Sequence, residues 1–258
     1  MIIDTHVHLD DKRYCDDLDD VIKRAQQNKV ERFIIPGADP RTLDRAVEIS
    51  LKYNNVYFAI GVHPYDIDLF EALDFEKYIN YEKCVAIGEC GLDYFRLNGS
   101  DSEKEQIKNK QKYVFKQQIM LAKKYHKPLI VHIRDSSNDA KNILLEYNAK
   151  EVGGVLHCYN ADEQLLCLAK ENFYFGIGGV VTFKNAKKLV NVLPKIPPEK
   201  LLIETDAPYL TPEPHRGQRN EPAYTSFVVR KISNLLSADI ASISDLTTKN
   251  AKRLFNIV

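Results

Sequence analysis

The 258-residue sequence has no excess of either charge, no paired cysteine motif and no long apolar segment. Its 36 Lys and Arg balance 36 Asp and Glu, so no global field attracts polyanions or acidic membranes, and any nucleic-acid binding must be local. The five cysteines form no C-x-x-C pair, which argues against a disulfide framework or zinc ribbon and favours a reducing cytoplasm. No apolar run approaches the roughly 18 residues of a membrane span. A cleaved leader would remove His6 and His8, so we expect the mature start here and a cytoplasmic protein.

Short β-branched runs alternate with amphipathic helical patterns along nearly the whole chain. In the helical stretches the apolar spacing changes from two to about 3.6 residues, as at Leu18, Val21, Ile22 and Ala25. Eight alternations favour one α/β domain over residues 1–258, a (β/α)8 TIM-type barrel, with an open doubly wound sheet as the alternative. The expected strands are 2–5, 32–36, 56–61, 85–88, 129–132, 154–157, 173–177 and 201–204, and the expected closing helices are 224–236 and 244–255.

Six histidines and acids stand where apolar runs end: His6, His8, Glu89, His132, His157 and Asp206. The C-terminal ends of parallel barrel strands meet at one face, so these side chains are expected to converge on one concave site. His6 and His8 are two positions apart, which on an extended strand points both imidazoles to the same side. A lone histidine beside an apolar run is usually a core or rim residue. The joint pattern favours a metal site instead.

Carboxylates can bridge two ions, and this suggests a division of the six residues. His6, His8 and Asp206 would hold one divalent ion, His132 and His157 a second, and Glu89 would bridge both. Two ions about 3.5 to 4 Å apart activate water and stabilise an in-line phosphoryl displacement. The pattern therefore indicates hydrolysis.

Longer motifs surround these residues: DTHVHLD, GVHPY, IGECGLDYF, LIVHIRDS, GVLHCY and ETDAPYLTPEPHRGQRNEP. Through them the whole chain resembles the TatD-type metal-dependent deoxyribonucleases, which belong to a superfamily of metal-dependent hydrolases with a distorted (β/α)8 barrel. H-x-H is shared by many amidohydrolases, whereas the segments around IGE-x-GLDY and TDAPYL are more particular. The resemblance implies one ion at His6, His8, Glu89 and Asp206, another at Glu89, His132 and His157, and 3′-5′ exonuclease activity on single-stranded DNA.

Metal identity stays open between Mg, Mn and Zn. Mixed nitrogen and oxygen ligands suit Zn or Mn better than Mg. The resemblance, in contrast, implies activity supported by Mg.

Four further residues follow expected strands and are candidates for substrate contact. His63 is interpreted as a phosphate donor or a residue supporting the ligands, with a structural role as the alternative. Tyr94 would form a wall of the site or belong to a turn. Arg134 would clamp a phosphate or pair with the acid after it. Arg216 would bind phosphate or belong to an Arg–Glu network of its own loop.

Side chains beside the ligands carry weaker signals. Exposed aromatics could stack unpaired bases, with rim packing as the more common alternative, at Tyr65, Tyr94, Tyr159 and Tyr209. Cys90 and Cys158 each adjoin a ligand, and because strand neighbours alternate they are expected to pack outward beneath helices. The lysine-rich stretch 104–127 keeps helical apolar spacing, which predicts a solvated helix rather than a DNA track.

These observations predict a two-metal phosphodiesterase that trims DNA from an end. Asp206 would take the proton of the attacking water, and Glu89 and His63 would be the other catalytic residues. An amide or ester hydrolase or deaminase, including a deacylase of misacylated tRNA, is the alternative, although a mononuclear deaminase needs no acid at Glu89. A metal-binding scaffold without turnover fits the complete ligand set less well. No membrane or obligatory protein partner is indicated.

Overall fold

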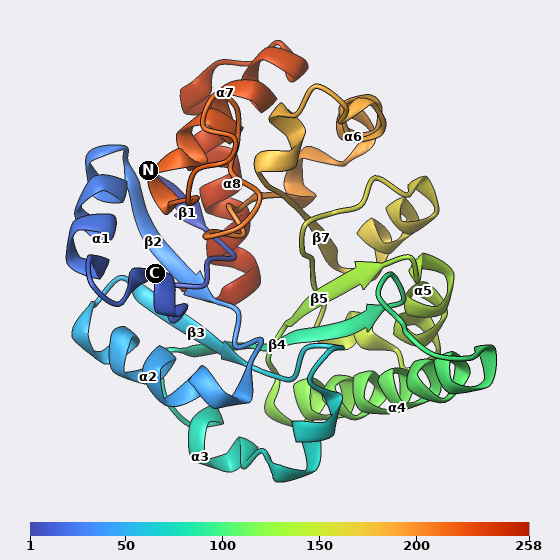
Figure 1. The fold of residues 1–258 in the computed structure, drawn as a ribbon. Helices are drawn as coiled ribbons and strands as arrows, with labels where there is room; N and C mark the ends of the chain where they lie inside the picture. The colour runs from blue at the N-terminus through green and yellow to red at the C-terminus, as the bar shows by residue number, and fades with distance from the viewer. Residues whose placement is uncertain (258) are drawn as a thin grey trace.

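The computed structural model describes residues 1–257, and its centre is an eight-stranded parallel sheet rolled into a barrel (Figure 1). Each strand pairs in parallel with the next one in sequence, from β1 through to β8. This order confirms the expected barrel, because a doubly wound sheet would reverse its strand order. The strands are β1 (Ile2–Asp4), β2 (Val30–Ile35), β3 (Val56–Ile60), β4 (Cys84–Asp93), β5 (Leu129–Arg134), β6 (Gly154–Leu156), β7 (Phe173–Ile177) and β8 (Leu201–Ile203).

The seam between β8 and β1 is closed by backbone hydrogen bonds just beyond the regular strands. The amide of Thr5 donates to the carbonyl of Ile203 at 3.2 Å, and the amide of Asp206 donates to that of His6 at 2.9 Å. An isolated parallel bridge joins Val7 to Ala207. The first and last strands thus meet where two sequence-predicted ligand segments emerge.

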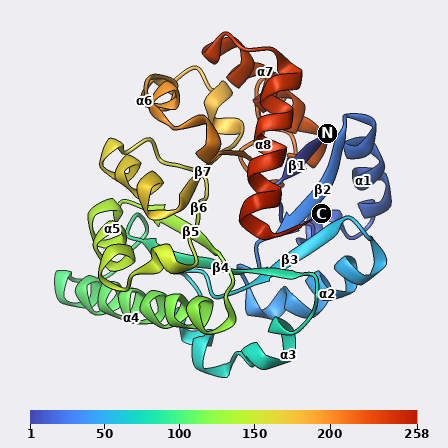
Figure 2. The ribbon, with the colours of Figure 1, turned by 180° about the vertical axis from the view of Figure 1, so that it is seen from behind.

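Helices surround the strands on the outside (Figure 1). The view from behind shows α8 running across the back of the molecule, next to the strands at both ends of the chain (Figure 2). Between β6 and β7 the cover is a 3-10 segment, η5 (Glu163–Glu171). The helices are α1 (Leu18–Gln27), α2 (Leu43–Lys52), α3 (Phe75–Ile79), α4 (Asp101–Tyr125), α5 (Ser137–Glu146), α6 (Lys187–Val192), α7 (Thr225–Leu236) and α8 (Ile240–Phe255).

Most element boundaries differ from the sequence expectation by no more than two residues, and two differ by more. β4 continues five residues past Gly88, because after a register shift it goes on pairing with β5 as far as Asp93. α8 begins four residues before Ser244, because the side chain of Asp239 accepts a hydrogen bond from the amide of Ser242 and caps an earlier first turn. Within residues 1–257, no helix combines the length and the apolar character needed to cross a membrane.

The barrel interior contains buried residues from every strand, packed against the C-terminal end of α8: Ile3, Ile34, Ala59, Val85, Ala86, Ile130, Val155, Tyr174 and Leu202. Side chains two positions further along a strand point to the same side. His132, His157 and Glu204 therefore face inward above Ile130, Val155 and Leu202. A second apolar layer lies between the strands and the helices and includes Val21, Ile22 and Ala25 of α1, as their spacing predicts.

Candidate metal centre

A cavity of about 840 Å³ opens at the C-terminal ends of the strands, and five of the six expected ligands line it: His8, Glu89, His132, His157 and Asp206. The sixth, His6, is fully buried, and its ring stacks on that of His157 with 3.4 Å between the centroids. Residues from six different places in the sequence thus converge as the motif pattern predicts.

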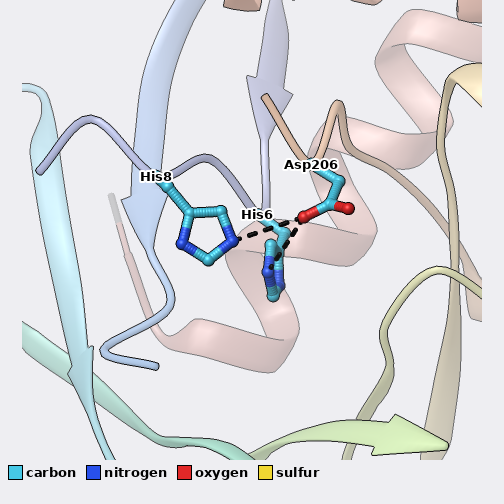
Figure 3. Close-up of side chains that lie close together, drawn as sticks. All are labelled: His6, His8 and Asp206. Atoms are coloured by element: carbon cyan, nitrogen blue, oxygen red, sulfur yellow. Dashed lines mark ion pairs between the residues drawn. The ribbon is translucent and has the colours of Figure 1, made fainter. Parts of the chain in front are cut away.

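The first group consists of His6, His8 and Asp206, which converge across the seam (Figure 3). An oxygen of Asp206, Oδ1, lies 3.3 Å from Nε2 of His8 and 3.7 Å from Nε2 of His6. Both histidines lie beyond the regular strand, because β1 ends at Asp4. The two rings nevertheless lie 5.1 Å apart and reach the same carboxylate.

A buried acid that sequence reasoning missed holds the two sides of this group together. Asp4 accepts hydrogen bonds from the amide of His6 at 3.3 Å and from the amide and hydroxyl of Thr205 at 3.0 and 2.6 Å. Burial raises the pKa of Asp4 to about 8. Its position at the end of β1, directly before the H-x-H motif, was the available signal.

Glu89 lies at the centre of the site. Its Oε1 is 2.9 Å from Nδ1 of His132, 3.6 Å from Nε2 of His63 and 3.8 Å from Nε2 of His157. Its Oε2 is 3.3 Å from Nε2 of His6. Burial raises the pKa of Glu89, but the surrounding histidines outweigh burial and hold it well below its usual value. The carboxylate is therefore an anion within reach of four imidazoles.

Carboxylates also fix the outer sides of two of these histidines. Asp93 Oδ2 lies 2.9 Å from Nε2 of His132, and Glu204 Oε1 lies 3.1 Å from Nδ1 of His157. Such contacts orient imidazole ligands and increase their basicity. Sequence reasoning missed Glu204, although it is two positions past the inward Leu202. A side chain in place of Gly176 would lie 2.2 Å from Glu204 Oε2, so this strand position requires glycine.

Neighbouring acids raise the pKa of His8 and His132, the two partly exposed histidines among the proposed ligands. Burial lowers the pKa of His8, but the hydrogen bond and charge of Asp206 outweigh it and raise the pKa to about 9. Burial likewise lowers that of His132, and Asp93 with Glu89 raises it to about 9. Both imidazoles are therefore cationic at neutral pH when no metal ion competes for their nitrogens.

The donor set fits divalent metal ions. Three groups have ligand atoms close enough to share one ion: His6, His8 and Asp206; His6, Glu89 and His157; His63, Glu89 and His132. Within residues 1–257, both buried ring nitrogens of His6 lack a hydrogen-bond partner. An unsatisfied buried polar atom costs about 1 to 3 kcal/mol, which a coordinated cation would remove. The structure also places His157 against His6 and brings His63 to His132, a grouping that the sequence-based division does not contain.

The four candidate substrate residues occupy different places. His63 and Arg134 line the cavity. The hydroxyl of Tyr94 donates instead to Asp139 at 2.9 Å in a neighbouring hollow. Arg216 lies outside the cavity wall, where it donates to the carbonyl of Thr211 at 3.0 Å and covers the ring of Phe183.

Other expectations for nearby residues have mixed outcomes. An Arg–Glu network is present after β8, but it is formed by Arg219, which pairs with both Asp17 and Glu221; among the described residues Arg216 has no acidic partner in it. Tyr159 is buried, so it offers no face to a base. The expectation that Cys158 packs outward is wrong. Its backbone is left-handed, with φ of 44°, which breaks the strand alternation and brings the residue into the cavity wall.

Comparisons with known proteins find TatD-type proteins and metal-dependent hydrolases. The family described as TatD related DNase matches residues 3–256. The chain is 47% identical to the metal-dependent hydrolase YabD of Bacillus subtilis, with full coverage of both chains. It is 34% identical to the 3′-5′ ssDNA/RNA exonuclease TatD of Shigella flexneri, with 99% of each covered. The crystal structure of the TatD homologue YjjV from Escherichia coli K12 superposes with a TM-score of 0.87 at 29% identity, covering 100% of this chain and 98% of that one.

Proposed function

The chain belongs to the TatD-related DNase family, and from this premise we propose that it is a divalent-metal-dependent deoxyribonuclease acting as a single domain. We further propose 3′-5′ exonuclease activity on single-stranded DNA in a reducing cytoplasm. The Shigella relative, named for 3′-5′ exonuclease activity on single-stranded DNA and RNA, supports the direction and strand preference.

One observation carries the proposal: the anionic Glu89 lies within 3.8 Å of four histidines that come from four different strand ends. Burying a carboxylate without a partner costs free energy, so the negative charge of Glu89 needs a positive charge beside it. A cation bound by the surrounding ligand atoms would supply that charge. Together with Asp206 the set offers nitrogen and oxygen donors for two ions. That donor chemistry suits Mn or Zn and admits Mg.

The proposed ligands are His6, His8 and Asp206 on one side, His132 and His157 on the other, and Glu89 between them. Divalent ions held there would supply Lewis acidity toward the scissile phosphodiester and its attacking water. The protein's own part is to orient the imidazoles of His132 and His157 through Asp93 and Glu204, and to hold the backbone of His6 through Asp4.

Asp206 is the proposed proton acceptor. Burial raises the pKa of its carboxyl, but His8 and the neighbouring imidazoles lower the pKa by a larger amount. The net pKa is below the usual value, so the group is ionised at neutral pH. It lines the cavity at the last strand end, where it can reach a water bound beside the substrate phosphorus.

His63 is proposed to donate a hydrogen bond to a phosphoryl oxygen. Its Nδ1 accepts from the amide of Tyr65 at 3.2 Å, which places the proton of the neutral ring on Nε2. Burial lowers the pKa of His63 to about 4, so the ring is neutral. Nε2 faces the central carboxylate and the cavity as a donor, an arrangement that favours stabilising charge on the phosphate over binding a metal.

The direct test is metal analysis of the purified protein together with nuclease assays after chelation and restoration of each metal. We expect loss of DNA cleavage on chelation and recovery with Mg, Mn or Zn. Amide, ester and misacylated-tRNA substrates should be assayed in parallel. Turnover of those substrates without cleavage of phosphodiesters would replace the nuclease by the alternative hydrolase.

A further inference from the structure

Arginines on one side of the cavity mouth are neutralised by acids. Arg41 pairs with Asp39 and Asp66 at 2.7 Å each. Arg13 pairs with Asp11, also at 2.7 Å. All three acids belong to the cavity wall, so this side offers little net positive charge to a polyanion.

On the other side of the mouth, after β4 and at the end of β5, two arginines form no ion pair with any of the described residues. Arg96 and Arg134 are exposed and line the same cavity. Among residues 1–257, no carboxylate oxygen lies within 4.0 Å of either guanidinium. Unpaired guanidinium groups at the edge of a site proposed to cleave phosphodiesters are positioned to contact phosphates.

An exposed aromatic ring accompanies these arginines. Phe95 is 53% exposed, and the guanidinium carbon of Arg134 lies 3.7 Å from its ring centroid. Stacking in this way fixes the guanidinium while leaving its N–H edge free for a phosphate. The loop is tied to the metal centre, because the amide of Phe95 donates to Asp93 at 2.9 Å and Asp93 also contacts His132.

A second hollow of about 900 Å³ adjoins the cavity and shares Arg134 and Asn160 with it. Its wall includes Lys188 and the amide side chain of Asn138. Two of its four acids are paired with lysines, Asp139 with Lys112 at 2.8 Å and Glu163 with Lys195 at 2.7 Å. None of the described residues forms an ion pair with the other two, Asp135 and Asp162.

We propose that the polynucleotide strand beyond the nucleotide in the metal cavity leaves across the loops after β4 and β5, with its phosphates on Arg96 and Arg134 and a base on Phe95, toward the second hollow. This inference rests on the proposed nuclease function and adds a direction to it. The occupant is an unpaired strand, because a base can stack on Phe95 only when it is free of a partner.

The salt dependence of binding tests the two arginines. A labelled eight-nucleotide DNA strand with phosphorothioate linkages is titrated onto the metal-loaded protein between 50 and 200 mM salt. Removing one phosphate contact reduces the slope of log affinity against log salt by about 0.7 for single strands. We expect this decrease for Arg96→Gln and for Arg134→Gln, about 1.4 for the double variant, and recovery with Arg134→Lys. The matched control is Arg41→Gln, whose side chain is already neutralised and whose slope should stay at the wild-type value.

Two further variants separate stacking from charge. Phe95→Ala should weaken binding of the strand about tenfold with a smaller change in salt slope than either arginine variant, because base stacking itself carries no counterion term and Arg134 keeps its charge. Tyr113→Ala, which removes a similarly exposed ring from the outer face of α4, is the control and should bind normally. Asp135→Asn should strengthen binding if the strand enters the second hollow.

Hydrolysis distinguishes failure of the path from failure of the function. Wild-type protein that cleaves both a dinucleotide and an octanucleotide, while the two arginine variants keep wild-type slopes, refutes the path alone. Protein that cleaves neither substrate with any divalent metal refutes the proposed function and the path built on it. The supporting result is a larger affinity gain from dinucleotide to octanucleotide in wild type than in either arginine variant.

Discussion

Replacing Asp206 by Asn should separate proton transfer from metal binding. Asn keeps the shape and one oxygen ligand but loses the charge and the basicity. The backbone of Asp206 is left-handed, with φ of 55°, a region that Asn tolerates better than most residues. We therefore expect Asp206→Asn to fold and to keep at least part of its metal.

The expected magnitude has two parts. Loss of a general base lowers kcat by about 10²-fold or more. In the metal-free protein Asp206 also supports the cationic form of His8, whose pKa is about 9 instead of 6.5. That difference corresponds to about 3 kcal/mol. Without the carboxylate the pKa of His8 should fall from this raised value, because only Glu89 and Asp10 then oppose the effect of burial.

The assay combines steady-state cleavage of single-stranded DNA at several pH values with elemental analysis of the same preparation. An NMR titration of the metal-free variant reports the pKa of His8 independently of turnover. The matched control is Asp44→Asn, which removes an exposed carboxylate paired with Lys77 that is not part of the cavity wall, and this variant should cleave normally. A variant that holds its metals and cleaves DNA at close to the wild-type rate across the pH range refutes the role of Asp206 in proton transfer.

Three other predictions follow from the site. Glu89→Gln and His132→Ala should each reduce turnover severely, because each change removes a contact at the centre of the site. Elemental analysis of each variant should show less bound metal, and a variant with normal metal content and a normal rate would contradict this prediction. Affinity of the metal-free protein for Mn should rise from pH 6 to pH 9, because His8 and His132, with pKa raised to about 9, must lose protons before they bind an ion. Calorimetry in buffers of different ionisation heat should detect proton release, and a flat pH profile would show that these imidazoles are not ligands. A closed circular single strand should resist cleavage that degrades its linear form, and rapid cutting of the circle rules out a strict exonuclease.

Sequence patterns predicted the barrel and the convergence of the six proposed ligands because both follow from periodicity and from where strands end. How these residues are divided between two ions was harder to predict from the sequence. It depends on ring orientation, and the structure stacks His157 on His6 and turns His63 toward Glu89. Those contacts join separate strand ends, so spacing along the chain carries no signal for them.

The supporting acids illustrate a different limit. Asp4 and Glu204 look like ordinary strand-end residues, and only the inward register of Leu202 marks Glu204 as an inward-facing residue. Cys158 was misplaced because its left-handed backbone departs from the alternation on which the prediction depended. Local geometry that breaks a periodic pattern cannot be read from that pattern.

If the proposed ion binds at the seam between β8 and β1, metal supply would affect folding as well as chemistry. Thr5 and Ile203, whose backbones meet there, are 198 positions apart, and His6, His8 and Asp206 follow directly after these strands. An ion held by these three residues would close a loop of most of the polypeptide, and at a concentration of 100 times its Kd it would stabilise the native state by about 2.7 kcal/mol. A nascent chain would then complete this site only after Asp206 has been synthesised.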